Sequence, residues 1–328
     1  EEVDVVPTQE FQEGGDVNVE MMEDGGAEID FDPNSNGAEG GEQHDANLAE
    51  FMEESEMTAL ASELQESFDE MKSARQEWED GYTKGLDLLG FKYENRSEPF
   101  QGASGATHPV LAEAVTQFQA LAYKELLPAG GPVRTQILGR VDPPKEQQAQ
   151  RVKDFMNHQI MNVMKEYEPE FDQMLFNLPL AGSTFKKVYF DSVIGRTVSK
   201  FVPAEELVVP YNATSLDDTD TIIHVLQMSG NDVLKQQISG FYRDVELTDP
   251  GANNANDVKE AKDRITGVAS DNYNEMHTLL ECHVELDLVG FEDKDKQSGE
   301  ETGLKLPYIV TIDDDSSTVL SIRRNYGA

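Results

Sequence analysis

The sequence predicts an α+β protein in which long helices come first and mostly antiparallel strands follow. Up to about residue 182, apolar residues recur three or four positions apart, which is the period of a helix with one apolar face. From residue 183 onward, short apolar runs alternate with polar residues and are separated by Gly, Asn and Asp, as in strands joined by turns. Helices and strands do not alternate along the chain, so a parallel sheet is not expected. The length of 328 residues indicates about two compact units.

Residues 1–46 are predicted to form an acidic low-complexity tail. Residues 1–60 contain 19 Asp and Glu, half of the net charge of −38, and Lys72 is the first basic residue of the chain. Glycine pairs recur among Asp, Glu and Asn, and there is too little apolar surface to offset the entropy lost on ordering. We therefore expect a solvated tail. The alternative is a segment that docks on a partner, for which a neighbouring subunit is the natural candidate.

Residues 47–182 are predicted to be a helical region. A long helix is expected from about Asn47 to Gly90, followed by a loop over residues 95–105. The apolar stripe of this helix consists of Leu60, Leu64, Phe68, Met71, Trp78, Tyr82, Leu86 and Leu89. A second helix starts near Thr107 and ends before Pro128. Its apolar face consists of Val110, Leu111, Ala114, Val115, Phe118, Leu121, Ala122 and Leu126.

The helical region is predicted to end with a short strand and two further helices. The strand is expected over residues 133–138. Pro143 and Pro144 then introduce a helix over about residues 145–167, because proline is favoured in a first helical turn. Its apolar stripe consists of Val152, Phe155, Met156, Ile160, Val163 and Met164. A fourth helix is expected over about residues 168–180.

Residues 183–328 are predicted to be a β-rich region with small helices. A hairpin is expected from residues 183–191 and 196–202, joined through Gly195. Further strands are expected over residues 207–211, 222–228, 278–288, 305–312 and 318–323. A short helix is predicted to follow Gly230 and to end at Ile238. Residues 248–273 are rich in Asn, Asp and Gly and are predicted to be an excursion with one or two helical turns.

The charge and the cysteine content exclude several classes of protein. A net charge of −38 disfavours general binding to nucleic-acid backbone, because phosphates are repelled. It does not exclude a protein that lets a duplex slide past without gripping it. Cys282 is the only cysteine, so the chain cannot form an internal disulfide or a common paired-cysteine zinc site. No apolar run approaches the length of a membrane span, so no membrane contact is expected.

No catalytic, cofactor-binding or metal-binding residue is predicted. The phosphate-binding glycine loops and the Gly-x-Ser-x-Gly elbow are missing. His277, Cys282 and His283 are potential ligands, but their spacing fits no common metal site, and Cys282 and His283 point to opposite faces of a strand. The acidic clusters 313–315 and 217–220 lack the loop pattern of a calcium site and are predicted to be solvated turns. A metal-dependent enzyme that uses these clusters is the weakest of the hypotheses that we consider.

Basic residues gather at two places in the β-rich region. Four lie on the predicted hairpin and two end the last predicted strand; they are Lys186, Lys187, Arg196, Lys200, Arg323 and Arg324. On an acidic protein such residues favour contacts between subunits over nucleic-acid sites, because self-association brings opposite charges together. We therefore predict these six residues as candidate subunit contacts.

Three stretches of the sequence resemble portal proteins of short-tailed bacteriophages and related prophages. The first begins at Arg96 and reads Arg-Ser-Glu-Pro-Phe-Gln-Gly-Ala-Ser-Gly-Ala-Thr-His-Pro-Val-Leu-Ala-Glu-Ala-Val. The second, Phe176–Asp191, contains Leu-Pro-Leu-Ala-Gly-Ser-Thr-Phe-Lys-Lys-Val-Tyr-Phe-Asp. The third is Phe201–Tyr211, Phe-Val-Pro-Ala-Glu-Glu-Leu-Val-Val-Pro-Tyr, and Ser239–Asp244 is also similar. The ordered succession, from about residue 50 to residue 326, carries the resemblance, whereas residues 1–45 match nothing in this family.

The resemblance implies a structural subunit of the portal, the head-to-tail connector at one capsid vertex. Such a protein is not an enzyme and needs no cofactor. It forms a ring, usually of twelve subunits, through which double-stranded DNA passes during packaging and ejection without sequence-specific binding. The implied partners are the major capsid protein, the terminase and tail or adaptor proteins, and the implied location is the virion, with assembly in the host cytoplasm. The two longest apolar stripes, Leu60–Leu89 and Val110–Leu126, are then expected to lie partly in subunit contacts.

The resemblance further implies that these residues belong mainly to the outer wing of the ring. Portal subunits of this type are usually longer, and their stem, clip and tunnel loop are expected in a C-terminal part beyond this sequence. The alternative to a portal subunit is an acidic helical adaptor or scaffold module that docks a basic partner through its N-terminal tail.

Overall fold

The computed structural model describes residues 18–21, 27–30, 46–89, 100, 108–191, 194–249, 257–266, 276–294 and 300–326. The chain divides into two compact units, residues 1–47 and 48–328. In the first unit, strands β1 (Asn18–Met21) and β2 (Ala27–Asp30) pair in antiparallel fashion. The sequence predicted a tail without strands in this segment, so this pair was missed. The predicted loop at residues 95–105 lies almost wholly outside the described residues.

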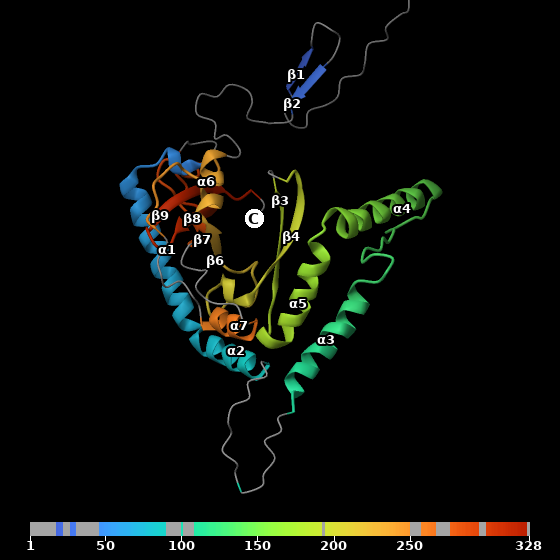
Figure 1. The fold of residues 1–328 in the computed structure, drawn as a ribbon. Helices are drawn as coiled ribbons and strands as arrows, with labels where there is room; N and C mark the ends of the chain where they lie inside the picture. Colours follow the sequence, from blue (N-terminus) through green and yellow to red (C-terminus); the bar gives the residue numbers. More distant parts are fainter. Residues whose placement is uncertain are drawn as a thin grey trace, which may run out of the picture. The chain divides into compact units, whose positions relative to one another are not determined.

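The second unit confirms the predicted order of helices and strands (Figure 1). The helices are α1 (Glu54–Ala74), α2 (Gln76–Leu89), α3 (Val110–Leu126), α4 (Pro143–His158), α5 (Tyr167–Ala181), α6 (Gly230–Ile238) and α7 (Asp257–Thr266). The strands are β3 (Phe185–Asp191), β4 (Arg196–Val202), β5 (Leu207–Val208), β6 (Thr221–Ser229), β7 (Met276–Leu286), β8 (Leu306–Asp313) and β9 (Thr318–Arg324). Strands β3 and β4 form an antiparallel hairpin, and the other five form one antiparallel sheet in the order β5-β6-β7-β8-β9.

The main core lies between α1 and one face of the five-stranded sheet. Helix α1 buries six residues spaced three or four apart: Met57, Leu60, Ala61, Leu64, Phe68 and Met71. The sheet contributes alternate residues of its strands, such as Leu280, Cys282 and Val284 of β7. This alternation is that of the predicted strand, in which successive side chains point to opposite faces. The predicted stripe from Leu60 to Met71 is thus buried within the chain.

The other face of the sheet is covered by α6 and by the segment that follows it. Val233 of α6 and Tyr242 pack with Leu279 of β7 and Leu320 of β9. Helix α6 begins as the sequence predicted, because the Oγ of Ser229 accepts a hydrogen bond from the backbone N–H of Asp232 at 3.2 Å. The sheet therefore lies between two apolar layers, and its strands hold residues of two separate cores.

The prediction of one continuous helix from Asn47 to Gly90 is wrong. The chain forms a 3-10 turn, η1 (Leu48–Glu50), then α1, and breaks between α1 and α2 at Arg75, where φ is −95° and ψ is 5°. The Arg75 guanidinium is largely buried and donates hydrogen bonds to the carbonyls of Glu205 (2.7 Å) and Leu207 (2.8 Å), as well as to Glu79. These contacts stabilise the interruption of the helix at Arg75. The apolar periodicity of the sequence does not reveal this interruption.

Helix α2 then packs on α7 and on the end of α5. Tyr82 and Leu86 of α2 are buried with Ala181, Ala204 and the α7 residues Val258 and Ala261. The indole N–H of Trp78 donates to the carbonyl of Ala181 at 3.0 Å. Helix α7 is longer than the one or two turns predicted for residues 248–273.

Three other predicted boundaries need correction. Residues 133–138 do not form a strand, because the Asn157 side chain takes the place of a strand partner: its Oδ1 accepts from the Val133 N–H at 2.9 Å and its Nδ2 donates to the Val133 carbonyl at 3.2 Å. The single helix predicted over 145–167 is instead the α-helix α4, which ends at His158, followed by a π-helical turn, Gln159–Val163. The strand predicted over 207–211 is limited to Leu207–Val208.

Candidate interaction surfaces

The four basic residues of the β3–β4 hairpin differ in whether they have partners within the chain. The Nζ of Lys186 lies 3.6 Å from the centroid of the Tyr167 ring and donates to Ser199 at 3.1 Å. Arg196 makes two parallel hydrogen bonds with the Glu166 carboxylate, at 2.7 and 2.8 Å. Lys187 is paired with Glu281 of β7, whereas Lys200 is exposed and has no ion-pair partner among the described residues.

The Arg196–Glu166 pair fixes the hairpin to the N-terminal end of α5. The hydrogen bond from Arg196 lowers the pKa of Glu166 to about 2, although partial burial opposes this change. A second link joins the same elements, because the Glu170 carboxylate accepts from the Phe201 N–H at 2.8 Å. The hairpin is thus joined to the start of α5 by an ion pair and by a hydrogen bond to its backbone.

Lys187 belongs to a half-buried polar cluster on the α6 side of the five-stranded sheet. Its partner, Glu281, also lies 2.9 Å from Nε2 of His283 and 3.9 Å from Nδ1 of His224. Burial raises the pKa of Glu281, but the hydrogen bonds from the two histidines and from Lys187 outweigh it, so the pKa lies well below its ordinary value. Local sequence patterns do not reveal this cluster, because two of the three partners of Glu281, Lys187 of β3 and His224 of β6, lie far from it along the chain.

The two arginines at the end of β9 also have neighbours within the chain. The Arg323 guanidinium lies over the Phe241 ring, 4.3 Å from its centroid, and donates to the Phe241 carbonyl at 2.9 Å. Arg324 lies 5.8 Å from the centroid of the Tyr326 ring. Five of the six predicted contact residues therefore already contact other groups of the chain, and the structure does not bring the six together into one patch.

The residues weighed as metal ligands are distributed over two faces of the sheet. Cys282 is buried toward α1, and this burial raises the pKa of its thiol to about 12. His277 and His283 point to the other face, where Nδ1 of His277 lies 3.4 Å from Oδ1 of Asp313 and His283 contacts Glu281. Within the described part of the chain, no three His, Cys, Asp or Glu residues are placed to hold a metal ion.

The turn at residues 313–315 is only partly the solvated turn that the sequence predicted, because Asp315 is exposed but the other two aspartates are not. Asp313 is fully buried, and its carboxylate accepts hydrogen bonds from the backbone N–H and the hydroxyl of Ser316, at 3.0 and 2.5 Å. The backbone carbonyl and the carboxylate of Asp314 accept from the Gln65 side chain of α1, at 2.8 and 3.1 Å. These two aspartates thus stabilise the β8–β9 turn and hold it on α1.

Apolar residues remain uncovered on α3. We call α3, the connection 127–142 and α4 the arm. The inner side of α3 packs on α5, where Ala122 and Tyr123 contact the cluster of Leu127, Phe171 and Leu175. Its outer side carries Val110, Ala114, Phe118 and Leu121, which lie within one quarter of the helix circumference and are all exposed. Val110 is 62% exposed and Leu121 is 69% exposed.

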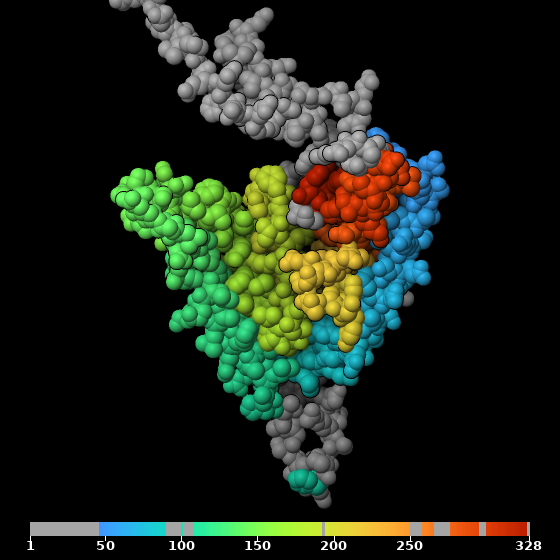
Figure 2. Space-filling view, turned by 180° about the vertical axis from the view of Figure 1, so that it is seen from behind, coloured from blue at the N-terminus to red at the C-terminus, as the bar shows by residue number. Residues whose placement is uncertain are grey.

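Helix α4 buries no residue, and Figure 1 shows it at the edge of the second unit, away from the five-stranded sheet. Its apolar residues Val152, Phe155 and Met156 share one face through their three- and four-residue spacing, and Phe155 is 60% exposed. Figure 2 shows the green residues of α3 and α4 on one flank of the unit and blue α1 on the other. The sequence predicted these apolar stripes, but periodicity does not tell whether the chain itself covers them.

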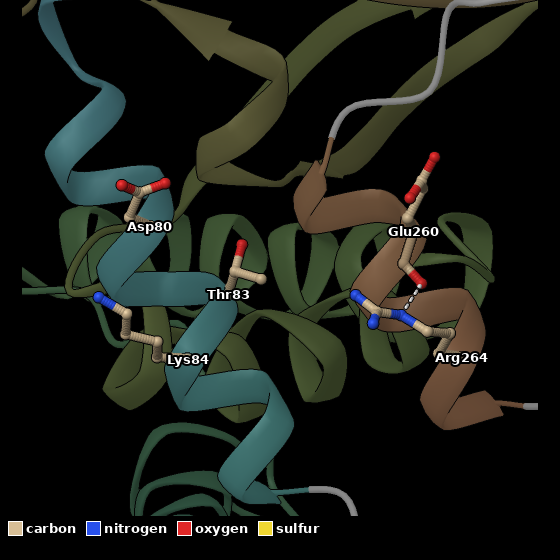
Figure 3. Close-up of a pocket in the computed structure, with 5 residues that line it drawn as sticks. All are labelled: Asp80, Thr83, Lys84, Glu260 and Arg264. Carbon is tan, nitrogen blue, oxygen red and sulfur yellow. Dashed lines mark hydrogen bonds between the residues drawn. The ribbon is translucent and has the colours of Figure 1, made fainter.

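Described residues of the second unit line two open pockets. One, of about 380 Å³, is lined by Asp80, Thr83 and Lys84 of α2 and by Glu260 and Arg264 of α7 (Figure 3). Its acids and bases balance, and Arg264 donates weakly to the carbonyl of Glu260 at 3.4 Å. The other pocket, of about 550 Å³, lies between the 128–135 segment and α4. Among the described residues that line it there are two bases and no acid.

No protein-family model matches the sequence, and the search of curated proteins finds no match either. In the part of the chain that the structure describes, no helix combines the length and the apolar character needed to cross a membrane. The arrangement of surfaces is therefore the main structural guide to function.

Proposed function

We propose that this chain is a structural subunit of a tailed-phage portal, contributing the outer wing of a ring at one capsid vertex. The observation that carries self-association is the pair of uncovered apolar faces on α3 and α4. The ordered resemblance of three sequence segments to portal proteins supports this particular assembly. The proposed role is mechanical: the ring forms a channel for DNA and a platform for the terminase, the capsid protein and tail proteins.

The uncovered face of α3 favours association with another protein surface. Fully burying one large aliphatic or aromatic side chain is worth about 1.5–3 kcal/mol. Three such residues, Val110, Phe118 and Leu121, lie together on the outer side of the helix. Scattered exposed apolar residues are ordinary, but a contiguous row on one helix is typical of an interface.

Helix α4 supports the same conclusion by a different argument. Most helices in proteins are stabilised by packing of an apolar face rather than by helix propensity alone. Helix α4 has 16 residues, an apolar face and no buried residue. A partner that covers Val152, Phe155 and Met156 supplies the packing that the chain itself does not.

The acidic character of the chain is compatible with a DNA channel that does not grip its cargo. Each phosphate contact made by Lys or Arg adds a counterion-release term that holds the duplex in place. With 26 Lys and Arg against 64 Asp and Glu, the chain offers few such contacts. The proposed partners include double-stranded DNA only as a molecule that passes through.

The proposal is tested by placing a charge on each uncovered face. We expect Leu121→Glu and Phe155→Glu to leave the far-ultraviolet circular dichroism of the chain unchanged and to dissociate the assembly, because a carboxylate is costly to bury in an apolar contact. Leu88→Glu is the matched control, since Leu88 of α2 is also 69% exposed but lies outside the arm. Particle mass is measured by native mass spectrometry.

The outcomes separate a ring subunit from an adaptor. Dissociation by the two arm substitutions but not by Leu88→Glu supports the proposal. A wild-type chain that is strictly monomeric contradicts it. Loss of all assembly on deletion of residues 1–45, with the arm substitutions silent, favours an acidic adaptor that works through its N-terminal segment.

A further inference from the structure

A basic region is built into this acidic chain. Residues 128–165 contain six Lys and Arg but only three Asp and Glu, whereas the whole chain has a net charge of −38. The region includes the 128–135 segment and α4, and the 550 Å³ pocket between them is lined by Gly131, Val133, Arg134, Thr135, Gln150 and Lys153, together with Pro128 and Gly130. We call this pocket the basic groove.

The walls of the basic groove are held together by specific contacts. Asn157 of α4 bonds both backbone groups of Val133, and the Thr135 hydroxyl donates to the Ala149 carbonyl at 3.2 Å. Gly131 has a φ of +89°, and a Cβ there would lie 2.3 Å from the Asn157 side chain. The segment can approach α4 this closely only because residue 131 is glycine. The groove is therefore pre-formed, which lowers the cost of binding a ligand.

The charges of the basic groove are available to a ligand. No ion pair within 4 Å involves Arg134 or Lys153 among the residues described, and both are at least partly exposed. Other bases of the chain are already neutralised: Arg75 by Glu79, Arg196 by Glu166 and Lys262 by Glu205. A ligand for this groove must supply negative charge.

We propose that the basic groove of one copy binds the acidic N-terminal segment, residues 1–45, of a neighbouring copy. That segment has fifteen Asp and Glu and no Lys or Arg. Its charge is complementary to that of the basic groove. This inference rests on the proposed self-association, which brings the segment of one copy to a high local concentration near its neighbour.

Charge also explains why this occupant is favoured over nucleic acid. In an assembly every copy adds fifteen negative charges, and their mutual repulsion opposes compact packing unless they lie near positive charge. The basic region provides that charge on each copy. A free duplex, in contrast, is repelled by the net negative charge of the whole chain before it reaches Arg134 and Lys153.

The test is carbodiimide cross-linking of the full chain, which joins a carboxylate to a lysine amine with loss of water. Equal amounts of ¹⁵N-labelled and unlabelled protein are assembled, cross-linked and digested. We expect peptides that join Lys153 to residues 1–45, half of them with mixed isotopes, which marks a link between copies. Lys84, in the charge-balanced pocket, is the control and is expected to give few such links. One molar salt should suppress the Lys153 links about tenfold or more, because exposed charges are then screened.

A substitution sharpens the test without removing the reporting lysine. Arg134→Glu is expected to reduce the Lys153 links about tenfold, and Arg264→Glu, in the other pocket, is expected to leave them unchanged. Links confined to one isotope, or the absence of links, overturn the inference. If particles of ring mass persist in that case, the proposed portal function is retained and only the binding of residues 1–45 in the basic groove is rejected. If the chain is monomeric, the proposed function fails as well. Protection of Lys153 by duplex DNA at lower concentration than by a peptide of residues 1–45 also overturns it, in favour of a nucleic-acid site.

Discussion

Helices α1 and α3 both carry apolar residues three or four positions apart, but the stripe of α1 is buried and the outer row of α3 is exposed. Helix α1 lies on the five-stranded sheet and buries six residues against alternate residues of the strands. Helix α3 buries only Val115 and leaves its outer row in solvent. The same pattern can therefore form a buried core, as in α1, or an uncovered apolar surface, as in α3, and only the fold distinguishes the two.

The largest expected difference comes from the same substitution in both helices. Leu64→Ala in α1 should lower the free energy of unfolding by about 3 kcal/mol, because it leaves a cavity in the core. Leu121→Ala in α3 should change it by about 0.5 kcal/mol or less in the isolated subunit, since the side chain is mostly in water. Urea unfolding of the monomer measures both. Equal losses would mean that the arm is part of the subunit core.

The next effect concerns the charged contact that ties the hairpin to the sheet. Glu281→Gln should lower the free energy of unfolding by about 2 kcal/mol, because Lys187, His224 and His283 lose their shared carboxylate. The pKa of Glu281 is depressed in the folded protein, so its contribution is present above the unfolded value of about 4.3 and is lost as the pH falls below it. The wild-type free energy of unfolding should therefore fall more steeply below pH 4.3 than that of the variant. Parallel curves would contradict the assignment.

A smaller effect separates Gly131 from Gly139, two of the three glycines of the arm connection. Gly131→Ala places a methyl group against Asn157, whereas Gly139→Ala, with a similar φ of +88°, meets no atom within 4 Å. Both variants carry a backbone cost of about 1 kcal/mol for the left-handed conformation. Gly131→Ala should lower the free energy of unfolding by about 1–2 kcal/mol more than Gly139→Ala does. It should also speed amide hydrogen exchange in α4. Identical exchange in both variants would show that the Asn157 contact does not hold α4 in place.

The smallest effect is the titration of Glu166 at the base of the hairpin. Its pKa should be about 2 in the wild type, because Arg196 donates two hydrogen bonds to it. Arg196→Gln should return the value toward 4.3. The stabilisation from this pair is present above about pH 4.3 and disappears as the pH falls through 2. Side-chain carboxyl NMR measures the shift directly, and an unchanged pKa in the variant would rule out Arg196 as its cause.

The residues themselves explain how much could be predicted. The order of elements, the β3–β4 hairpin and the alternation of β7 follow from local periodicity, and the structure confirms them. The break at Arg75 and the loss of a strand at 133–138 depend on side chains that bond distant backbone, Arg75 to residues 205 and 207 and Asn157 to Val133. Such contacts have no local signature.

That the six basic residues contact other subunits stays a prediction, and their surroundings in the fold could not be read from the sequence. The six basic residues were chosen from their positions on strands, but Glu166, Glu281 and Phe241 come from elsewhere in the chain to contact three of them. Arg134 and Lys153, which form no ion pair with a described residue, were predicted to lie in a strand and in a helix, and only their juxtaposition in the fold creates a groove.

The most direct test of the central claim is the mass of the particle that the full chain forms in solution. Twelve copies of 36.5 kDa give a ring of roughly 440 kDa. Mass photometry of the wild-type protein should show one closed species near that mass, and Leu121→Glu should convert it to the monomer. A wild-type monomer at micromolar concentration, or an open series of masses without a closed species, would contradict a portal ring.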